Sequence, residues 1–224
     1  MVDSLLRVRG LCKRFGAVQA SRDLSLDVME GEIHALIGPN WAGKTTAIKQ
    51  LCGEIQPDEG SIVFAGREIS NMAAHERARL GLARSFQITS VFEHLSVDEN
   101  IALAVQAHAG HSFSFWRSAR RDPRLQIPTR AAVEFCGLEA RADLLAANLS
   151  HGEKRQLDVG MALAGKPKLL LLDEPMAGMG PGGTIKLTEL IGEIKGSVTM
   201  LLVEHDMDVV FYLEIGRASC RERV

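Results

Sequence analysis

The sequence predicts an α/β fold organised around a mostly parallel β-sheet, and three apolar runs are the basis of that prediction. Residues 33–37, 169–172 and 197–203 are short and largely apolar, which is typical of strands buried on both faces. Each run is followed directly by glycine, acidic or histidine residues. Because ligands of open α/β sheets bind at the carboxyl ends of the strands, we expect the functional residues at these positions.

The N-terminal region predicts further strands. Residues 5–8 alternate apolar and basic side chains in the manner of an edge strand, and residues 25–28 alternate as well. Phe15 lies in the polar stretch 13–16, which we expect to be a turn. An aromatic ring there is suited to stack on a nucleotide base, because every base presents a π-face. A core or rim aromatic is the other interpretation.

Residues 38–46 are the segment around which the chain is organised. Gly38 and Gly43 are separated by four residues and followed by Lys44 and Thr45, between a predicted strand and a predicted helix. This spacing is that of the phosphate-binding loop of nucleotide triphosphatases. Glycines let consecutive backbone N–H groups curve around an anion, and the helix N-terminus adds a partial positive charge. Lys44 would reach the β- and γ-phosphates and the Thr45 hydroxyl would ligate Mg²⁺; an ordinary glycine turn is the other interpretation.

After this loop the pattern predicts two more strands and a short helix. Residues 61–64 are a strand, and a short basic helix follows from about residue 71 until Gly81 separates it from a strand over residues 82–86. Gln87 comes directly after that strand. Its amide oxygen is suited to a metal or a water and its N–H to a phosphate, although a surface glutamine has the same appearance.

Two further helices are predicted by their apolar spacing. The first covers residues 97–109 and begins with a capping box, in which Ser96 is the N-cap and Glu99 follows three residues later. The second is an amphipathic helix over residues 185–194.

The segment 111–130 differs from its surroundings because aromatic and arginine residues alternate in it. Such interleaving is typical of nucleic-acid stacking. The charge is local and the whole chain is mildly acidic, so we favour a solvated loop between helices or a docking face for a partner protein.

A helix running to about residue 164 begins at a second capping box, Ser150 with Glu153. The capping box is by itself a sufficient explanation of these residues. An exposed helix N-terminus with Ser150 and Gly152 is also suited to a second phosphate contact.

Acidic and imidazole side chains follow two of the predicted strands. Asp173 and Glu174 come after the four-leucine run 169–172, and His205 follows the run 197–203. Asp173 would hold Mg²⁺ through water, and Glu174 would orient or deprotonate the attacking water. His205 would lie at the same sheet edge as a sensor or water-positioning group. Solvated acids and a structural histidine are the other interpretations.

The composition is that of a domain with a sizeable core. The chain has 224 residues, is 46% hydrophobic and carries a formal net charge of −2, which gives no global nucleic-acid signature. Its four cysteines are scattered without metal-ligand spacing, as in a reduced cytoplasmic protein. We expect no signal peptide and no membrane-spanning segment, so any action at a membrane would require a partner.

Together these motifs resemble the ATP-binding cassette family, in its transporter-ATPase branch, over residues 4 to about 213. The order and spacing of the phosphate loop, Gln87, the signature at 149–153, the acidic pair and His205 all agree with that family. The resemblance implies a P-loop NTPase with a RecA-like core, an N-terminal antiparallel β-subdomain and an inserted α-helical subdomain over about residues 88–165.

The resemblance also implies the site residues and a head-to-tail dimer that holds ATP and Mg²⁺ between its subunits. The implied catalytic residues are Glu174, His205, Gln87 and Lys44, and the implied metal ligands are Thr45, Gln87 and Asp173. The implied nucleotide contacts are Phe15, Gly38, Pro39, Asn40, Trp41, Ala42, Gly43, Lys44, Thr45, Thr46, Ser150 and Gly152, the last two from the opposite subunit.

Finer features, at residues 149–157, 174–180 and 203–208, are similar to ATPase subunits of bacterial branched-chain amino-acid importers. This implies membrane-spanning permease subunits, a second ATPase subunit and, indirectly, a periplasmic substrate-binding protein as partners, with no nucleic acid. The expected location is the cytoplasmic face of the inner membrane. Urea or amide importers are the alternative substrate class, because the transported molecule never touches this subunit.

Trp41 departs from the family pattern, which has glycine at this position of the loop. A loop glycine often needs φ > 0, which costs an L-residue about 1–2 kcal/mol, and an indole adds bulk beside the phosphates. We therefore expect weakened ATP binding or hydrolysis. A sequencing error or a deliberate substitution would also account for this residue.

The tail 214–224 is the second departure, because the family resemblance stops near residue 213. Read back into codons, the tail resembles a sequencing-library adapter, so we expect a non-native tail and a truncated C-terminus. Finding these codons in the genome would refute that expectation. Missing C-terminal strands would expose apolar surface and an unpaired sheet edge.

Two other classes of protein share these motifs. A non-transport cassette protein acting on DNA or ribosomes usually pairs two cassettes or carries a coiled-coil insertion, and neither is found in this sequence. A regulatory subunit that binds nucleotide without hydrolysis is disfavoured by Glu174 and His205 and favoured by Trp41 and the missing C-terminus.

Overall fold

The structure, a computed structural model, describes residues 4–38, 43–85, 91–108, 122–205 and 207–213, and the backbone of 216–219. The chain forms two compact units. Unit 1 comprises Met1–Arg84, Lys168–Pro175 and Ile194–Val224, and unit 2 comprises Ser85–Pro167 and Met176–Glu193.

Unit 1 contains an antiparallel sheet of β1 (Leu6–Phe15), β2 (Val18–Val28), β4 (Glu59–Phe64) and β5 (Arg67–Glu68), in the order β2-β1-β4-β5. The prediction of an edge strand at residues 5–8 is wrong, because β1 pairs with both β2 and β4. Alternation of apolar and polar residues indicates one buried face and one solvated face. A central strand of an antiparallel sheet has these two faces just as an edge strand does. Phe15 is the last residue of β1 rather than part of a turn.

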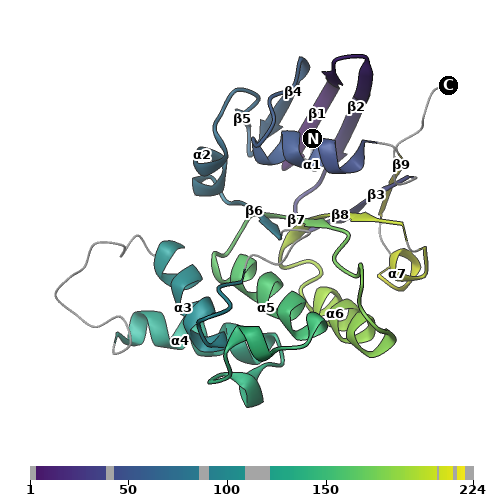
Figure 1. The fold of residues 1–224 in the computed structure, drawn as a ribbon. Helices are drawn as coiled ribbons and strands as arrows, with labels where there is room; N and C mark the ends of the chain where they lie inside the picture. Colours follow the sequence, from purple (N-terminus) through teal and green to yellow (C-terminus); the bar gives the residue numbers. More distant parts are fainter. Residues whose placement is uncertain are drawn as a thin grey trace. The chain divides into compact units, whose positions relative to one another are not determined.

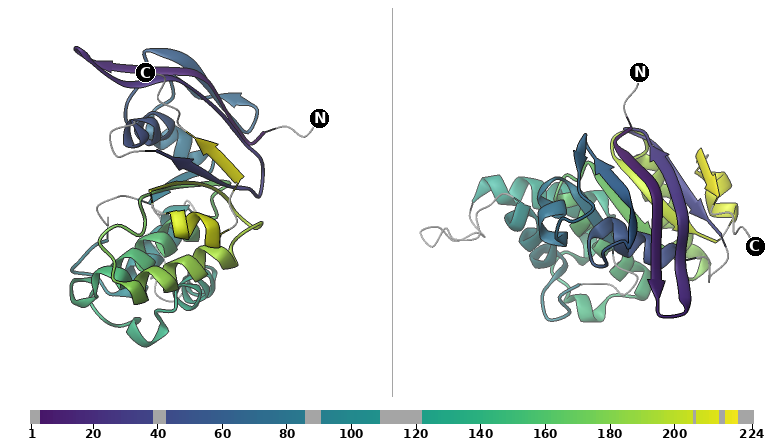
Figure 2. Two further views of the ribbon diagram at one scale, coloured as in Figure 1. Left: turned by 90° about the vertical axis from the view of Figure 1, so that its right-hand side faces the viewer. Right: turned by 90° about the horizontal axis from the view of Figure 1, so that it is seen from above.

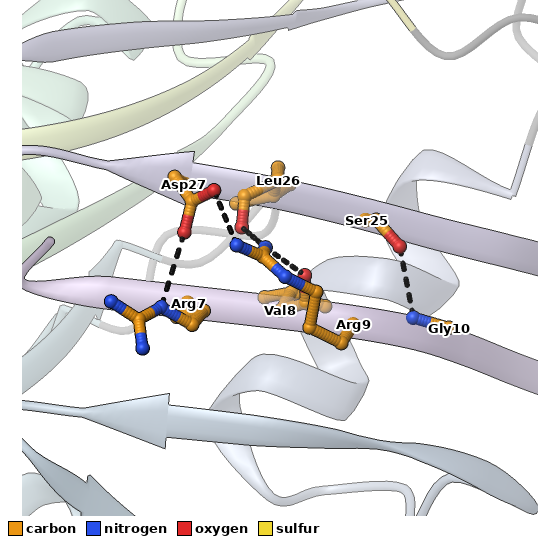
Figure 3. A network of polar contacts seen from close by, with 7 residues as sticks. All are labelled: Arg7, Val8, Arg9, Gly10, Ser25, Leu26 and Asp27. Atoms are coloured by element: carbon orange, nitrogen blue, oxygen red, sulfur yellow. Dashed lines mark hydrogen bonds and ion pairs between the residues drawn. The ribbon is translucent and has the colours of Figure 1, made fainter.

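Two basic residues of β1, Arg7 and Arg9, are exposed and pair with Asp27 of β2 (Figure 3). Arg9 donates to Asp27 at 2.6 Å, and Arg7 approaches the other carboxylate oxygen at 3.5 Å. The hydrogen bond from Arg9 is the main reason why the pKa of Asp27 is lowered. At Gly10 the register between the two strands shifts, and the Gly10 N–H donates to the Ser25 hydroxyl at 2.9 Å.

The second sheet of unit 1 has the order β6-β7-β8-β3-β9, built from β6 (Leu82–Ser85), β7 (Leu169–Asp173), β8 (Thr199–Glu204), β3 (Ile33–Ile37) and β9 (Gly216–Ser219). The β3–β8 and β7–β8 pairs are parallel, which confirms the predicted fold class. Every residue of β7 and β8 is buried. The sequence predicts no strand in the tail, yet β9 pairs parallel with β3. An edge strand offers a row of backbone groups with which an added segment can pair.

Helix α1 (Lys44–Cys52) lies between the two sheets of unit 1 (Figures 1 and 2). Its apolar residues Ile48 and Leu51 are fully buried in one cluster with Leu6 of β1 and Leu171 of β7. The same unit contains the short helices α2 (Ala74–Arg79) and α7 (Met207–Tyr212). Because α1 is buried on both sides, the residues at its N-terminus are held by both sheets.

Unit 2 is helical, with α3 (Val97–His108), α4 (Pro123–Phe135), α5 (His151–Ala164) and α6 (Pro181–Glu193). The predicted capping box is confirmed: the Ser96 hydroxyl accepts from the Glu99 N–H at 3.1 Å, and the Glu99 carboxylate accepts from the Ser96 N–H at 2.9 Å. None of the helices in the described ranges is long and apolar enough to cross a bilayer.

The predicted loop over 111–130 is wrong from residue 123 onward, because α4 begins there, while residues 109–121 lie outside the described ranges. The Asp122 side chain accepts from the Arg124 N–H at 3.0 Å, and Pro123 occupies the first helical position. Aspartate at the N-cap followed by proline is a helix-start signal, which the arginine and aromatic pattern obscured.

Candidate functional site at one edge of the parallel sheet

The carboxyl ends of β3, β8 and β7 meet at one edge of the parallel sheet. Ile37 at the end of β3 is opposite Glu204 at the end of β8, and Asp173 at the end of β7 is opposite Val203. Gly38, His205 and Glu174 are therefore the next residues of three neighbouring strands. The structure thus brings together, within unit 1, the three segments that the sequence singles out as chemical.

Lys44 is the first residue of α1 and is 2% exposed. Its ammonium group donates to the carbonyl oxygen of Gly38, so the side chain turns back along the start of the loop. A buried lysine at a helix N-terminus combines a full positive charge with the partial charge of the helix dipole. This combination is suited to an anion.

Gly43 precedes the helix with φ +75°, in the left-handed region. A Cβ atom at this position would lie 1.7 Å from the backbone carbonyl oxygen of Ala20 in β2. Glycine is therefore required here both by the dihedral angle and by the close approach of the antiparallel sheet.

Asp173 is buried at the end of β7 and contacts an arginine that the sequence analysis did not single out. Arg84, on β6, donates to Asp173 Oδ2 at 3.1 Å and also to the carboxylate of Glu54. The Asp173 side chain is 0% exposed and that of Arg84 is 8% exposed. The sequence places Arg84 in the predicted strand before Gln87. Its contact with Asp173 could be inferred only once the order of the strands in the sheet was known.

Glu174 and His205 face each other at the ends of β7 and β8. The His205 Nδ1 atom lies 4.0 Å from Glu174 Oε1, beyond hydrogen-bond distance. Glu174 has φ 46°, and its N–H donates to the carbonyl of Val203 at 2.9 Å. A non-glycine residue in this region costs of order 1–3 kcal/mol, and such strain is common at functional sites. The His205 side chain is 52% exposed.

Ser150 and Gly152 belong to unit 2, at the N-terminus of α5. The predicted capping box with Glu153 is confirmed, because the Ser150 hydroxyl accepts from the Glu153 N–H at 3.3 Å and the Glu153 carboxylate accepts from the Ser150 N–H at 2.9 Å. A Cβ atom on Gly152 would lie 3.4 Å from Met179 Cε. The His151 ring lies 3.4 Å from the Ala177 carbonyl oxygen, which joins this segment to the one before α6.

The remaining predicted site residues fall into two groups. Phe15 is 48% exposed at the end of β1, with the Lys13 ammonium 5.7 Å from its ring centroid, and Thr45 and Thr46 lie in the first turn of α1. Pro39, Asn40, Trp41, Ala42 and Gln87 lie outside the described residues.

A cavity of 660 Å³ lies in unit 2, lined mainly by residues of α3 and α4 such as Leu103 and Ile127. None of the residues singled out from the sequence as site residues lines it. It therefore does not bear on the phosphate chemistry.

The three described cysteines have free thiols. Burial raises the pKa of Cys52 and of Cys136 to about 12, so these thiols are protonated and unreactive at neutral pH. This agrees with the prediction of reduced cysteines, while Cys220 lies outside the described residues.

Comparisons with known proteins find one matching family and several similar proteins. Residues 21–177 match the protein family described as ABC transporter. The chain is 38% identical over 217 residues to the high-affinity branched-chain amino acid transport ATP-binding protein LivG of Salmonella typhimurium, covering 94% of this chain and 85% of that protein. It is 35% identical over 215 residues to the corresponding protein BraF of Pseudomonas aeruginosa, covering 92% and 84% of the two chains.

Among solved structures, the chain is similar to the ADP conformation of an ATP-binding cassette of an ABC transporter. The TM-score is 0.81 and the identity is 28%, over 94% of this chain and 84% of that one. The sheet arrangement described above is therefore that of a nucleotide-binding cassette.

Proposed function

Because the chain belongs to the ABC transporter family, we propose that it is the ATP-hydrolysing subunit of a bacterial importer for branched-chain amino acids. The observation that carries the proposal is the shared edge of the parallel sheet, where the strand register brings together the segments that begin at Gly38, Glu174 and His205. The names of the relatives supply the substrate class.

The phosphate chemistry in this proposal begins at α1. Lys44 binds the β- and γ-phosphates, and the N–H groups at the helix N-terminus, with Gly38 and Gly43 allowing the curvature, bind the same anion. Pro39, Asn40, Trp41, Ala42 and Thr46 are the other proposed contacts of this loop. Its support is the burial of Lys44 and its bond to the Gly38 carbonyl, which a phosphate oxygen can replace as acceptor.

The donor set also fits Mg²⁺, which prefers oxygen ligands and uses few protein groups besides substrate phosphates. Asp173 supplies a buried carboxylate and Thr45 a hydroxyl at the first turn of α1, with Gln87 proposed as a third ligand. Bound there, Mg²⁺ offsets the charge of the phosphates. Glu174 positions the attacking water and takes its proton, and His205 holds the γ-phosphate side of the site from the neighbouring strand.

Two further parts of the proposal concern the dimer and the base of the nucleotide. Phe15, half exposed at the end of β1, stacks on adenine. Ser150 and Gly152 of a second subunit close on the phosphates in a head-to-tail dimer. We propose residues 4–213 as the ATPase domain, with the helical subdomain over about residues 88–165.

The proposed partners are membrane-spanning permease subunits, a second ATPase subunit and, indirectly, a periplasmic substrate-binding protein. The relatives are named as ATP-binding proteins of transport systems, which supports a peripheral position on a membrane. The cytoplasmic face of the inner membrane is the location that delivers cellular ATP to this site.

ATP turnover by the Glu174→Gln variant tests the site. We expect turnover to fall by about 10²–10⁴-fold, the usual contribution of a general base, while Mg·ATP binding is retained. The exposed residue Glu30 in the turn before β3 provides a matched control. Equal turnover of Glu174→Gln and Glu30→Gln would remove Glu174 from the mechanism.

Transport in vesicles that contain this chain and its permease subunits tests the substrate class. We expect ATP-dependent uptake of labelled leucine that urea does not compete with. Competition by urea and no uptake of leucine would favour the urea importers instead.

A further inference from the structure

Arg84 is a buried cation between two carboxylates at the candidate metal site. It donates to Asp173 Oδ2 at 3.1 Å and to the carboxylate of Glu54. Asp173 and Arg84 are separated by 89 residues in sequence and come from β7 and β6, which are neighbours in the sheet. All three residues lie in unit 1.

The charges of these three groups explain why an arginine is placed there. A buried carboxylate needs a hydrogen-bond donor or a counter-charge, and Arg84 supplies both to Asp173. Glu54 offsets the positive charge of Arg84 on its other side. The three groups together carry one formal negative charge. A carboxylate has about four acceptor positions, so the hydrogen bond from Arg84 would be compatible with Asp173 holding a cation through water.

The anchor of Arg84 connects the metal site with the phosphate-loop helix. Glu54 follows Gly53, the C-cap of α1, and its N–H donates to the carbonyl of Lys49 at 3.0 Å. Arg84 thus ties the segment that ends α1 to the end of β7. An arginine whose two terminal nitrogens both donate to carboxylates has its planar guanidinium group fixed in orientation.

We propose that Arg84 is a positioning residue for Asp173: its hydrogen bond orients that buried carboxylate for the Mg²⁺ of Mg·ATP, and Glu54 holds the other side of the guanidinium. This inference rests on the proposed function. In this arrangement Arg84 touches neither nucleotide nor metal and acts through Asp173.

Arg77 provides a control for effects that are merely structural. It is also buried, and it donates to the backbone carbonyls of Gln50 and Leu51 in the last turn of α1. Like Arg84, it is hydrogen-bonded to the C-terminal end of α1 or to the residues that directly follow it. The bonds described for it end on backbone carbonyls rather than on Asp173.

The experiment measures binding of a fluorescent ATP analogue to the full chain, first without metal and then during a Mg²⁺ titration. The variants are Arg84→Met, Arg84→Lys, Glu54→Gln and Arg77→Met, and each is made also in a Trp41→Gly background so that the loop substitution does not hide the effect. Thermal unfolding is recorded for each variant.

For Arg84→Met we expect the Mg²⁺ concentration at half-effect to rise by about 10–100-fold, the usual consequence of removing a partner of a metal ligand. Metal-free nucleotide affinity should stay within about twofold, because the phosphate contacts are unchanged. Arg84→Lys should recover part of the loss, since a lysine keeps the charge without the fork. Arg77→Met should lower the unfolding temperature and leave the Mg²⁺ titration unchanged.

An unchanged or tighter Mg²⁺ dependence in Arg84→Met would overturn the inference, because the arginine would then be a bystander or a competitor of the metal. If Arg84→Met does not fold, Arg84→Lys and Glu54→Gln decide, and wild-type Mg²⁺ dependence in both overturns it. If the unsubstituted chain and Trp41→Gly both bind no nucleotide, the proposed function itself fails. If nucleotide binding by the parent chain depends on Mg²⁺ and the variants show the same dependence, only the role of Arg84 is refuted and the proposed function stands.

Discussion

Replacing Gly43 by alanine tests whether the phosphate loop depends on its contact with the antiparallel sheet. The left-handed φ of +75° costs an alanine about 1–2 kcal/mol. The added Cβ would lie 1.7 Å from the Ala20 carbonyl oxygen, which is backbone and cannot rotate away. Displacing a packed segment in this way costs typically about 1–3 kcal/mol more. The expected loss in the free energy of unfolding is therefore roughly 2–5 kcal/mol.

The assay is urea unfolding followed by circular dichroism, together with binding of a fluorescent ATP analogue. Gly66→Ala is the matched control, because Gly66 has φ +76° and, apart from its chain neighbours, no atom of the described residues lies within 4 Å of the position of its Cβ. It should lose only the dihedral cost of about 1–2 kcal/mol and bind nucleotide normally. Equal losses in the two variants, with unchanged nucleotide affinity in both, would refute the steric reasoning at the loop.

Four further predictions concern the loop, the end of α1 and the start of α5. Trp41→Gly should raise ATP affinity and turnover, because glycine adds no side chain beside the phosphates. Unchanged affinity in a binding titration and unchanged turnover would contradict this. Arg77→Met should lower the urea-derived stability by roughly 2–6 kcal/mol, because buried carbonyls of α1 lose their donor; a change below that of a surface Arg67→Met control would disprove it. Ser150→Ala should cost about 1 kcal/mol through loss of the N-cap. The backbone hydrogen bond from Ser150 lowers the pKa of Glu153, so the stability that Glu153 adds over Glu153→Gln is present above its ordinary pKa of 4.5 and should fade as the pH drops below it. A stability difference between the unsubstituted chain and Glu153→Gln that stays constant as the pH falls would argue against the capping box.

Residues at the ends of strands were predictable because the signals are local. The apolar runs that precede Gly38, Asp173 and His205 are strands β3, β7 and β8. The two capping boxes were equally predictable, since a serine and a glutamate three residues apart meet in the first turn of any helix.

Local signals failed where the neighbours decide. The alternation in residues 5–8 does not reveal that β1 lies between β2 and β4. The arginine and aromatic pattern led to the prediction of a loop where α4 begins, although Asp122 and Pro123 form a helix-start signal. The pairing of β9 with β3 depends on an available edge rather than on the composition of the tail.

The sequence by itself determined the order of strand, loop and helix around Lys44 and the identity of the side chains at three strand ends, because hydrophobic period and glycine spacing act over a few residues. The tertiary structure alone decided that Arg84 holds Asp173, that the carbonyl of Ala20 makes glycine necessary at position 43, and that Glu174 has a positive φ. These contacts join residues that are remote along the chain. They depend on which strands are neighbours in the sheets, and no local pattern encodes that order.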